Sequence, residues 1–323
     1  MAEVPPFRSG PRFSPETFAG RLRNIALQLN PASLFVSDAD VDKACALLKS
    51  HKAGLSTATD AELWSAAELK GARCHPDTGE KIFLPLCFAC FGPAQPPIIV
   101  GMLWPGGSAL NQAVWQFVNQ TYNSAIFFAN KNKSSEVSDA DALVSSGAAV
   151  ATSIGLGVGF TKMGQSIKHP RWGPLVAGWA GFAGCVGAGC ASLLLMRKDE
   201  LYNGVNVSDA NGLVHGKSKV AAQEGIAKCC VSRVVWNIPA TGMTPLILLK
   251  WHATPACIAL PMPAKLAVDT VIISIGLVVG LFPGQALFSQ NASVPLDRIE
   301  PEFRGCLTEK GEPVTEFFYN KGL

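Results

Sequence analysis

The polar residues best placed to bind a ligand in this sequence are amides that recur along one segment. Between residues 111 and 130, Gln112, Gln116, Asn119, Asn123 and Asn130 stand at offsets of 4, 7, 11 and 18 from the first. On a helix these offsets form one polar stripe on an otherwise apolar and aromatic surface. Amides supply hydrogen-bond donors and acceptors without the cost of a buried charge. The stripe is expected either to line a polar cavity inside a membrane protein or to face water from an interfacial helix.

One arginine lies in apolar surroundings. Arg233 is the single charged residue of the window 229–249. A charge at membrane depth is costly and marks a functional candidate, whereas a charge near a helix end can reach the headgroups. Beyond it, Pro239 and Pro245 predict a helix break that exposes backbone carbonyls, or a plain kink. Asp269, near the start of the last apolar window, is a candidate partner for the arginine.

A short polar segment, HPDTGE, directly precedes the first apolar window. It begins at His75; Pro76 and Gly79 favour a turn, and Asp77 and Thr78 can cap the helix that follows. We interpret it as a tightly specified turn at the membrane entrance, with substrate gating as a functional hypothesis. This segment has no metal-ligand spacing and no nucleophile–base pair.

Cys87 and Cys90 have the spacing of a redox or zinc motif, but no second cysteine or histidine pair completes a site. The sequence therefore predicts no metal site, no cofactor and no enzymatic activity.

These residues belong to a chain that is short of charge. Of its 323 residues 48% are hydrophobic and 16% are charged, and the net charge is +3; soluble domains carry about 25% charged residues. So small a net charge excludes nucleic-acid binding through a basic patch. Five windows hold at most one charge each: 82–103, 142–163, 172–196, 229–249 and 266–290. Because about 20 apolar residues cross a bilayer core, the sequence predicts an all-α membrane protein with about five transmembrane helices within a domain over 82–290.

A helical N-terminal region over 1–81 is expected to lie outside or on the membrane, with a small β-hairpin over 203–216 outside it and a loop-like tail over 291–323. The transmembrane domain also includes an amphipathic helix over 111–130, for which the two placements given above stay open. The first N-terminal helix, expected to begin at Ser14 and Pro15, lies either on the membrane surface or against the protein's own helices. Gly155 and Gly159 form a GxxxG pair, which predicts close helix approach.

Six segments carry distinctive motifs: HPDTGEK at 75–81, WQFVNQTYN at 115–123, LMRKDEL at 195–201, DANGLVHG at 209–216, VSR at 231–233 with its downstream proline, and FYNKGL at 318–323. Together they resemble the motifs of the sideroflexins, multi-pass proteins of the mitochondrial inner membrane. The resemblance covers nearly the whole chain. Two segments depart from the family pattern, at 128–132 and at 287–290, where a serine replaces the proline of the family's LFPQ.

The resemblance implies a mitochondrial inner-membrane transporter of serine or similar small neutral amino acids. In that hypothesis Asn119, Gln120 and Asn123 bind the polar groups of the substrate, Arg233 binds its carboxylate, and the turn at His75 shapes the entrance. The predicted partners are the amino-acid substrate, membrane lipid and other inner-membrane subunits, with no nucleic acid. The alternative hypothesis is a non-transporting structural or accessory subunit of a larger mitochondrial membrane complex. The sequence does not decide the membrane orientation.

Overall fold

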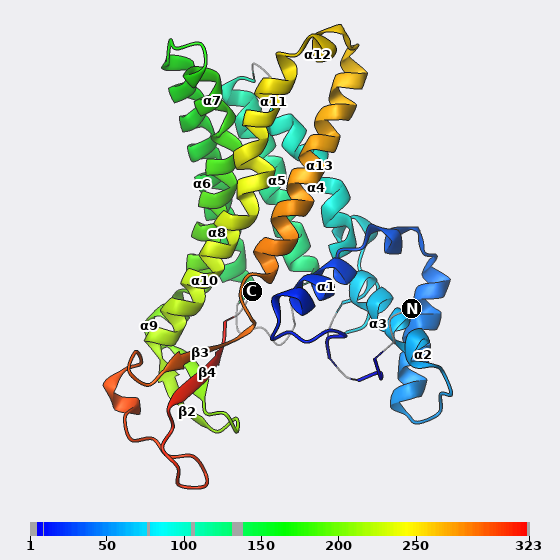
Figure 1. The fold of residues 1–323 in the computed structure, drawn as a ribbon, viewed down its shortest axis with the longest axis vertical. Helices are drawn as coiled ribbons and strands as arrows, with labels where there is room; N and C mark the ends of the chain where they lie inside the picture. Colours follow the sequence, from blue (N-terminus) through cyan, green and yellow to red (C-terminus); the bar gives the residue numbers. More distant parts are fainter. Residues whose placement is uncertain (1–4, 9, 76–77, 105–106, 131–137, 322–323) are drawn as a thin grey trace.

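The computed structural model describes residues 5–8, 10–75, 78–104, 107–130 and 138–321. Most of them are helical, and the longer helices stand side by side in one bundle (Figure 1). The bundle consists of α4 (Phe88–Met102), α5 (Ala109–Asn130), α6 (Asp139–Ser166), α7 (Trp172–Gly178), α8 (Ala180–Met196), α10 (Lys219–Asn237), α11 (Thr244–His252) and α13 (Met262–Ala286). Short α12 (Pro255–Ala259) marks one end, here called the far end, and short α9 (Lys198–Asn203) leads into a small sheet at the opposite, sheet end.

Among the described residues, three helical stretches are long and apolar enough to cross a membrane: Asp139–Ser166, Trp172–Met196 and Met262–Ala286. They correspond to three of the five predicted windows. The window 82–103 forms α4, which is only 15 residues long and contains three prolines. The window 229–249 is divided between α10 and α11 by a π-helical segment, Ile238–Met243. A count of about five spans therefore stays a prediction.

The amphipathic segment 111–130 forms α5, which passes through the bundle beside α4 in the opposite direction (Figure 1). Asn130 Nδ2 donates to Leu86 O at 2.9 Å, and Tyr122 OH donates to Pro85 O at 3.0 Å, so the end of α5 lies beside the start of α4. The chain has thus returned to the sheet end before α6 begins there. Both ends of the described chain lie toward the sheet end as a result.

This return predicts that both termini face the same side of the membrane, whereas five crossings would put them on opposite sides. Epitope tags at the two termini should be digested together, or protected together, when a protease is added to sealed membrane vesicles. A tag inserted after Ala253, at the far end, is the control and should behave in the opposite way. Termini of opposite accessibility would show that α5 does not cross.

The N-terminal region contains α1 (Phe18–Gln28), a 3₁₀ turn (Pro31–Phe35), α2 (Asp38–Lys52) and α3 (Asp60–Arg73). Thr17 caps α1, three residues after the predicted start. Ser37 caps α2, and Thr59 forms the predicted capping box with Glu62 at α3. Arg21 Nε donates to Ala286 O at 2.7 Å, and Ile25 packs in the core cluster of α13. Of the two placements predicted for the first helix, packing on the protein's own helices is therefore the one observed.

The sheet contains four strands in the order β2-β1-β4-β3 and is antiparallel. The predicted hairpin is confirmed as β1 (Val205–Ser208) and β2 (Val214–Ser218), with Gly212 at φ +89° in the turn. Burial alone would raise the pKa of Asp209, but the amides of Leu213 and Asn211, which donate to its carboxylate, hold it below its usual value.

The C-terminal tail is more ordered than predicted. It supplies β3 (Asn291–Pro295) and β4 (Glu316–Asn320), whose Val294 and Phe317 are fully buried against Val207. Glu300 also caps α10, since its carboxylate accepts the amides of Lys219 and Val220. The alternation of buried and exposed residues in each strand is the signal for a half-buried sheet, but each run is only five residues long.

The GxxxG prediction at Gly155 and Gly159 is wrong. Both glycines are exposed, and a Cβ added at either would meet nothing within 4 Å. The close contacts on α6 are made by Gly157, which is buried and faces α5, and by Gly164, which is buried against α7. The inward face of α6 is thus the one that carries Gly157, and Gly155 and Gly159 lie on the outward face.

Candidate substrate-binding site

The amide stripe of α5 faces the interior of the bundle. Gln116 is fully buried, and Gln112, Asn119 and Gln120 are at most 6% exposed, while Asn123 is half-buried. The apolar face of the same helix points outward: Leu110, Val114 and Phe117 are among its exposed residues. A helix with its polar face inward and its apolar face outward suits a lipid surround. The interfacial alternative, with the amides in water, is therefore not what the structure shows.

Ser153 of α6 links two of these amides. Its hydroxyl donates to Gln116 Oε1 at 2.5 Å and accepts from Gln120 Nε2 at 3.4 Å. Space for the Gln116 side chain comes from glycines on both neighbouring helices. A Cβ at Gly157 would lie 3.1 Å from Gln116 Cγ, and one at Gly184 of α8 would overlap its Nε2. Gln116 is thus held in a slot that any larger residue on α6 or α8 would close.

The three amides predicted to bind substrate point to three different helices. Asn119 Nδ2 lies 3.5 Å from Cys185 Sγ on α8, Gln120 reaches Ser153 on α6, and Asn123 Oδ1 accepts from Gln95 Nε2 of α4 at 3.2 Å. They therefore do not form one direct cluster. They connect α5 to each of its neighbours through polar contacts.

Arg233 is half-buried in the bundle and contacts no carboxylate among the described residues. Its guanidinium stacks over the Trp236 ring, 5.9 Å from the ring centroid. Gly189 of α8 makes room for it, because a Cβ there would lie 3.2 Å from Arg233 Cδ. The structure shows no ion pair or hydrogen bond of this guanidinium with any other described residue. The predicted partnership with Asp269 is wrong, since Asp269 instead contacts His252 Nε2 at 2.9 Å.

Arg233 and Asn119 approach the same face of α8. Asn119 contacts Cys185, and Arg233 lies against Gly189, four residues further along the helix. Four residues correspond to about one helical turn, roughly 6 Å of rise. Of the four predicted binding residues, these two are the pair that the fold brings to neighbouring positions.

The helix break near Arg233 is a π-helical turn rather than an open gap. Pro239 lies within it and lacks the amide that would bond Val235 O, but the amide of Ile238 donates to that carbonyl. Two further carbonyls at the turn are also bonded: Thr244 Oγ1 donates to Pro239 O at 2.8 Å, and Thr241 Oγ1 donates to Asn237 O at 3.1 Å. These carbonyls are therefore not free for a substrate. Pro245 is in the first turn of α11, after the break.

Three glycines that were not predicted from the sequence form a stripe on α13. A Cβ at Gly276 would lie 2.9 Å from Pro239 O, one at Gly280 would overlap Trp236 O, and one at Gly284 would lie 2.5 Å from Trp236 Cβ. The three glycines recur every four residues, so they share one helix face. This face lets α13 pack directly on the π-helical turn and on the residue that stacks with Arg233.

The HPDTGE segment closes a tight turn between α3 and α4. The amide of His75 donates to Glu80 O at 2.8 Å, Gly79 N donates to His75 O at 2.9 Å, and Gly79 has φ +69°. Thr78 N donates to His75 Nδ1 at 3.3 Å. Pro76 and Asp77 lie outside the described residues. The turn is placed at the sheet end, and a gating role for it stays a prediction.

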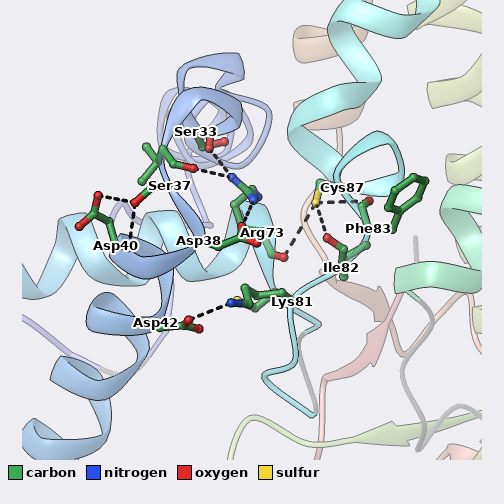
Figure 2. A network of polar contacts seen from close by, with 12 residues as sticks. Ser33, Ser37, Asp38, Asp40, Asp42, Arg73, Lys81, Ile82, Phe83 and Cys87 are labelled. Atoms are coloured by element: carbon green, nitrogen blue, oxygen red, sulfur yellow. Dashed lines mark hydrogen bonds and ion pairs between the residues drawn. The ribbon is translucent and has the colours of Figure 1, made fainter.

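Arg73, directly before this turn, is a buried charge that the sequence analysis missed. It is 4% exposed, and Figure 2 shows its guanidinium between Ser33 and Asp38. It donates to Ser33 O at 2.9 Å, to Val36 O at 3.1 Å and to Asp38 Oδ1 at 2.8 Å. Arg73 thereby fastens α3 to the chain that enters α2.

Arg73→Ala should loosen the N-terminal region. The change leaves the carbonyls of Ser33 and Val36 and the carboxylate of Asp38 without their partner, at a cost of about 2–4 kcal/mol. Hydrogen exchange of α2 and α3 amides should accelerate, while exchange in α6 stays unchanged. Lys43→Ala, which removes an exposed ion pair with Asp40, is the control and should have no measurable effect. Unchanged exchange in Arg73→Ala would contradict the fastening role.

One sizeable pocket, of about 480 Å³, opens at the far end of the bundle. It lies among the ends of α4, α5, α6, α7 and α11, and Gln112 of the amide stripe is part of its lining. Within the described parts of the chain, no group of three or more His, Cys, Asp or Glu side chains is arranged to hold a metal ion. The open volume therefore adjoins the outer end of the amide stripe.

The fold and the site define a helical membrane protein with an inward-facing stripe of amides on one helix and, near Asn119, an arginine that has no ion pair among the described residues. A model of the sideroflexin family matches residues 8–323. The chain therefore belongs to the sideroflexin family, whose members are transporter-like membrane proteins.

Individual relatives match over almost their full length. A sideroflexin of Dictyostelium discoideum is 33% identical over 97% of this chain and 96% of its own. Sideroflexin-5 of Rattus norvegicus is 30% identical over 100% of this chain and 94% of its own. A sideroflexin of Saccharomyces cerevisiae is 30% identical over 97% and 96%. No solved structure matches the chain.

Proposed function

We propose that the protein carries serine or a similar small neutral amino acid across the mitochondrial inner membrane. The observation that carries the proposal is Arg233, a half-buried guanidinium with no ion pair among the described residues. It contacts α8 about one helical turn from the place where Asn119 does. A cation of this kind can bind a carboxylate through two parallel hydrogen bonds. Family membership supports the transporter class, and the resemblance on which it rests implies the compartment.

Within this proposal the amides have different tasks. Arg233 binds the carboxylate, and the Asn119 side chain, whose other contact is the weak acceptor Cys185 Sγ, offers its Oδ1 to the ammonium or hydroxyl group. Gln120 and Asn123 are already hydrogen bonded to Ser153 and Gln95, so they position α5 between α6 and α4. A zwitterion suits this interior because its charges are matched by one cation and neutral acceptors.

The arrangement corresponds to one state of an alternating-access cycle. The pocket of about 480 Å³ is open at the far end. At the sheet end the C-terminal tail is docked: Arg197 Nη1 donates to Lys321 O at 2.6 Å, and Lys321 is 6% exposed. The structural-subunit alternative requires no such opening, so the pocket favours transport.

Purified protein in liposomes should take up radiolabelled serine with saturable kinetics. We expect unlabelled alanine or cysteine to compete, and glutamate and lysine not to compete, because the interior around Arg233 offers no second charge to match theirs. Protein-free liposomes provide the background. Uptake that does not exceed this background would contradict the proposed function and favour the structural alternative.

A further inference from the structure

The far-end pocket is lined mainly by apolar residues, with a few polar side chains among them. Its polar lining side chains are Gln112, Thr161, Gln165 and His252, and no Lys or Arg is among the described residues that line it. Thr161 Oγ1 donates its proton to Gly157 O at 2.9 Å, which leaves the hydroxyl oxygen as an acceptor. The pocket therefore differs in chemistry from the surroundings of Arg233.

Gln112 carries an acceptor without a partner. The residue is 5% exposed, and its Nε2 donates to Met102 O. That bond fixes which end of the amide is the oxygen. Its Oε1 has no hydrogen-bond partner among the described residues. Buried polar atoms are normally paired, so an orphan acceptor beside an open pocket indicates a donor that arrives with a ligand.

The pocket also has a carboxylate behind it. His252 lines the pocket, and its Nε2 contacts both Asp269 oxygens, at 2.9 and 3.0 Å. Asp269 is 7% exposed, and the neutral His252 ring, which donates its Nε2 proton to Asp269, is the one described side chain in polar contact with this carboxylate. The hydrogen bond between ring and carboxylate increases the capacity of His252 Nδ1 to accept a proton donor. The negative charge of Asp269 thus favours a cationic ligand on the His252 side of the pocket.

We propose that the far-end pocket binds the ammonium group of the amino-acid substrate, as a first station before Arg233. The inference rests on the proposed function and identifies the pocket through which the substrate enters the protein. Pro245, in the pocket lining, is twelve residues beyond Arg233, or about 18 Å along the helix axis. A small amino acid cannot reach both places at once. The substrate is held first by its ammonium group at the far end and then by its carboxylate at Arg233.

Binding of two half-substrates to the full-length protein in nanodiscs separates the two stations. Ethanolamine has the ammonium group without the carboxylate, and 3-hydroxypropanoate has the carboxylate without the ammonium group. We expect Gln112→Leu and Asp269→Asn each to weaken ethanolamine binding about 10-fold in titration calorimetry, with 3-hydroxypropanoate binding unchanged. Arg233→Ala should weaken 3-hydroxypropanoate binding alone. The Asp269→Asn side chain can still form a hydrogen bond to His252, so we expect this variant to stay folded and any loss of ethanolamine binding to reflect the lost charge.

Gln28→Leu, the same change at an exposed position on α1, is the matched control and should alter neither ligand. The proposal is overturned if ethanolamine does not bind, if both variants bind it normally, or if they weaken 3-hydroxypropanoate equally. Ethanolamine binding that falls in both variants, in a protein that shows no serine uptake, would remove the transport proposal and keep the ammonium pocket.

Discussion

Arg233→Ala should lower the kcat/KM of serine uptake at least about 100-fold without unfolding the protein. Two hydrogen bonds from a guanidinium to a carboxylate contribute about 3 kcal/mol, and each 1.4 kcal/mol corresponds to a factor of ten. Stability should be unchanged or slightly higher, because Arg233 has no ion pair in the described chain to lose and no longer has to be desolvated. Uptake into liposomes and thermal unfolding in detergent are measured on the same preparation.

Arg197→Ala is the matched control for a buried arginine that has partners. Arg197 is 9% exposed, pairs with Glu200 at 2.5 Å and donates to Lys321 O. Its loss should reduce the free energy of unfolding by about 2–3 kcal/mol. Arg233→Lys keeps the charge but not the two-pronged geometry, so uptake should return only in part. Normal serine uptake by Arg233→Ala would contradict the assignment of Arg233 to carboxylate binding.

The sequence predicted the bundle well where hydropathy reports burial in lipid. The windows 142–163, 172–196 and 266–290 coincide with α6, with α7 and α8, and with α13. It left the placement of α5 open between a cavity lining and an interfacial helix and did not count α5 among the spans, because a window average adds the buried amides to the exposed apolar residues of the same helix. A helix can carry amides through a bundle when neighbouring helices, rather than lipid, face them. Whether the amides face helices or lipid depends on which helix face points inward. A hydropathy average over a window carries no information about that direction.

Arg233 was recognisable because a lone charge in an apolar window is rare, but its surroundings were not. The prediction that paired it with Asp269 ignored position along the bundle axis. Asp269 contacts His252, and His252 is nineteen residues beyond Arg233 on the broken helix, about 28 Å away along its axis. Two charges in different windows meet only when the helices bring them to the same level. That level depends on the lengths of loops and on the π-helical turn.

Glycine patterns show the same limit. Gly155 and Gly159 have the spacing for close helix packing yet face outward, whereas Gly276, Gly280 and Gly284 on α13 have it and do pack. Spacing identifies residues that share a face, but it does not identify the partner of that face. The inward direction of α13 is set by Trp236 and Pro239, which need a glycine surface opposite them.

Gly280→Ala should therefore be among the most damaging small substitutions in the chain. The added Cβ would overlap Trp236 O, a backbone atom that cannot rotate away, so α13 must move from the π-helical turn, and about 3 kcal/mol of stability should be lost. Because Trp236 stacks with Arg233, serine uptake should fall as well. The Arg233→Ala variant separates these effects, since it loses uptake alone.

Gly155→Ala is the matched control, a glycine-to-alanine change in a helix that meets open space. It should leave uptake unchanged and raise stability by about 0.5–1 kcal/mol, because alanine has the higher helix propensity. Thermal unfolding of both variants in the same detergent measures the difference. Equal unfolding temperatures for Gly280→Ala and Gly155→Ala would show that α13 does not pack on the π-helical turn, and the packing around Arg233 described above would then be wrong.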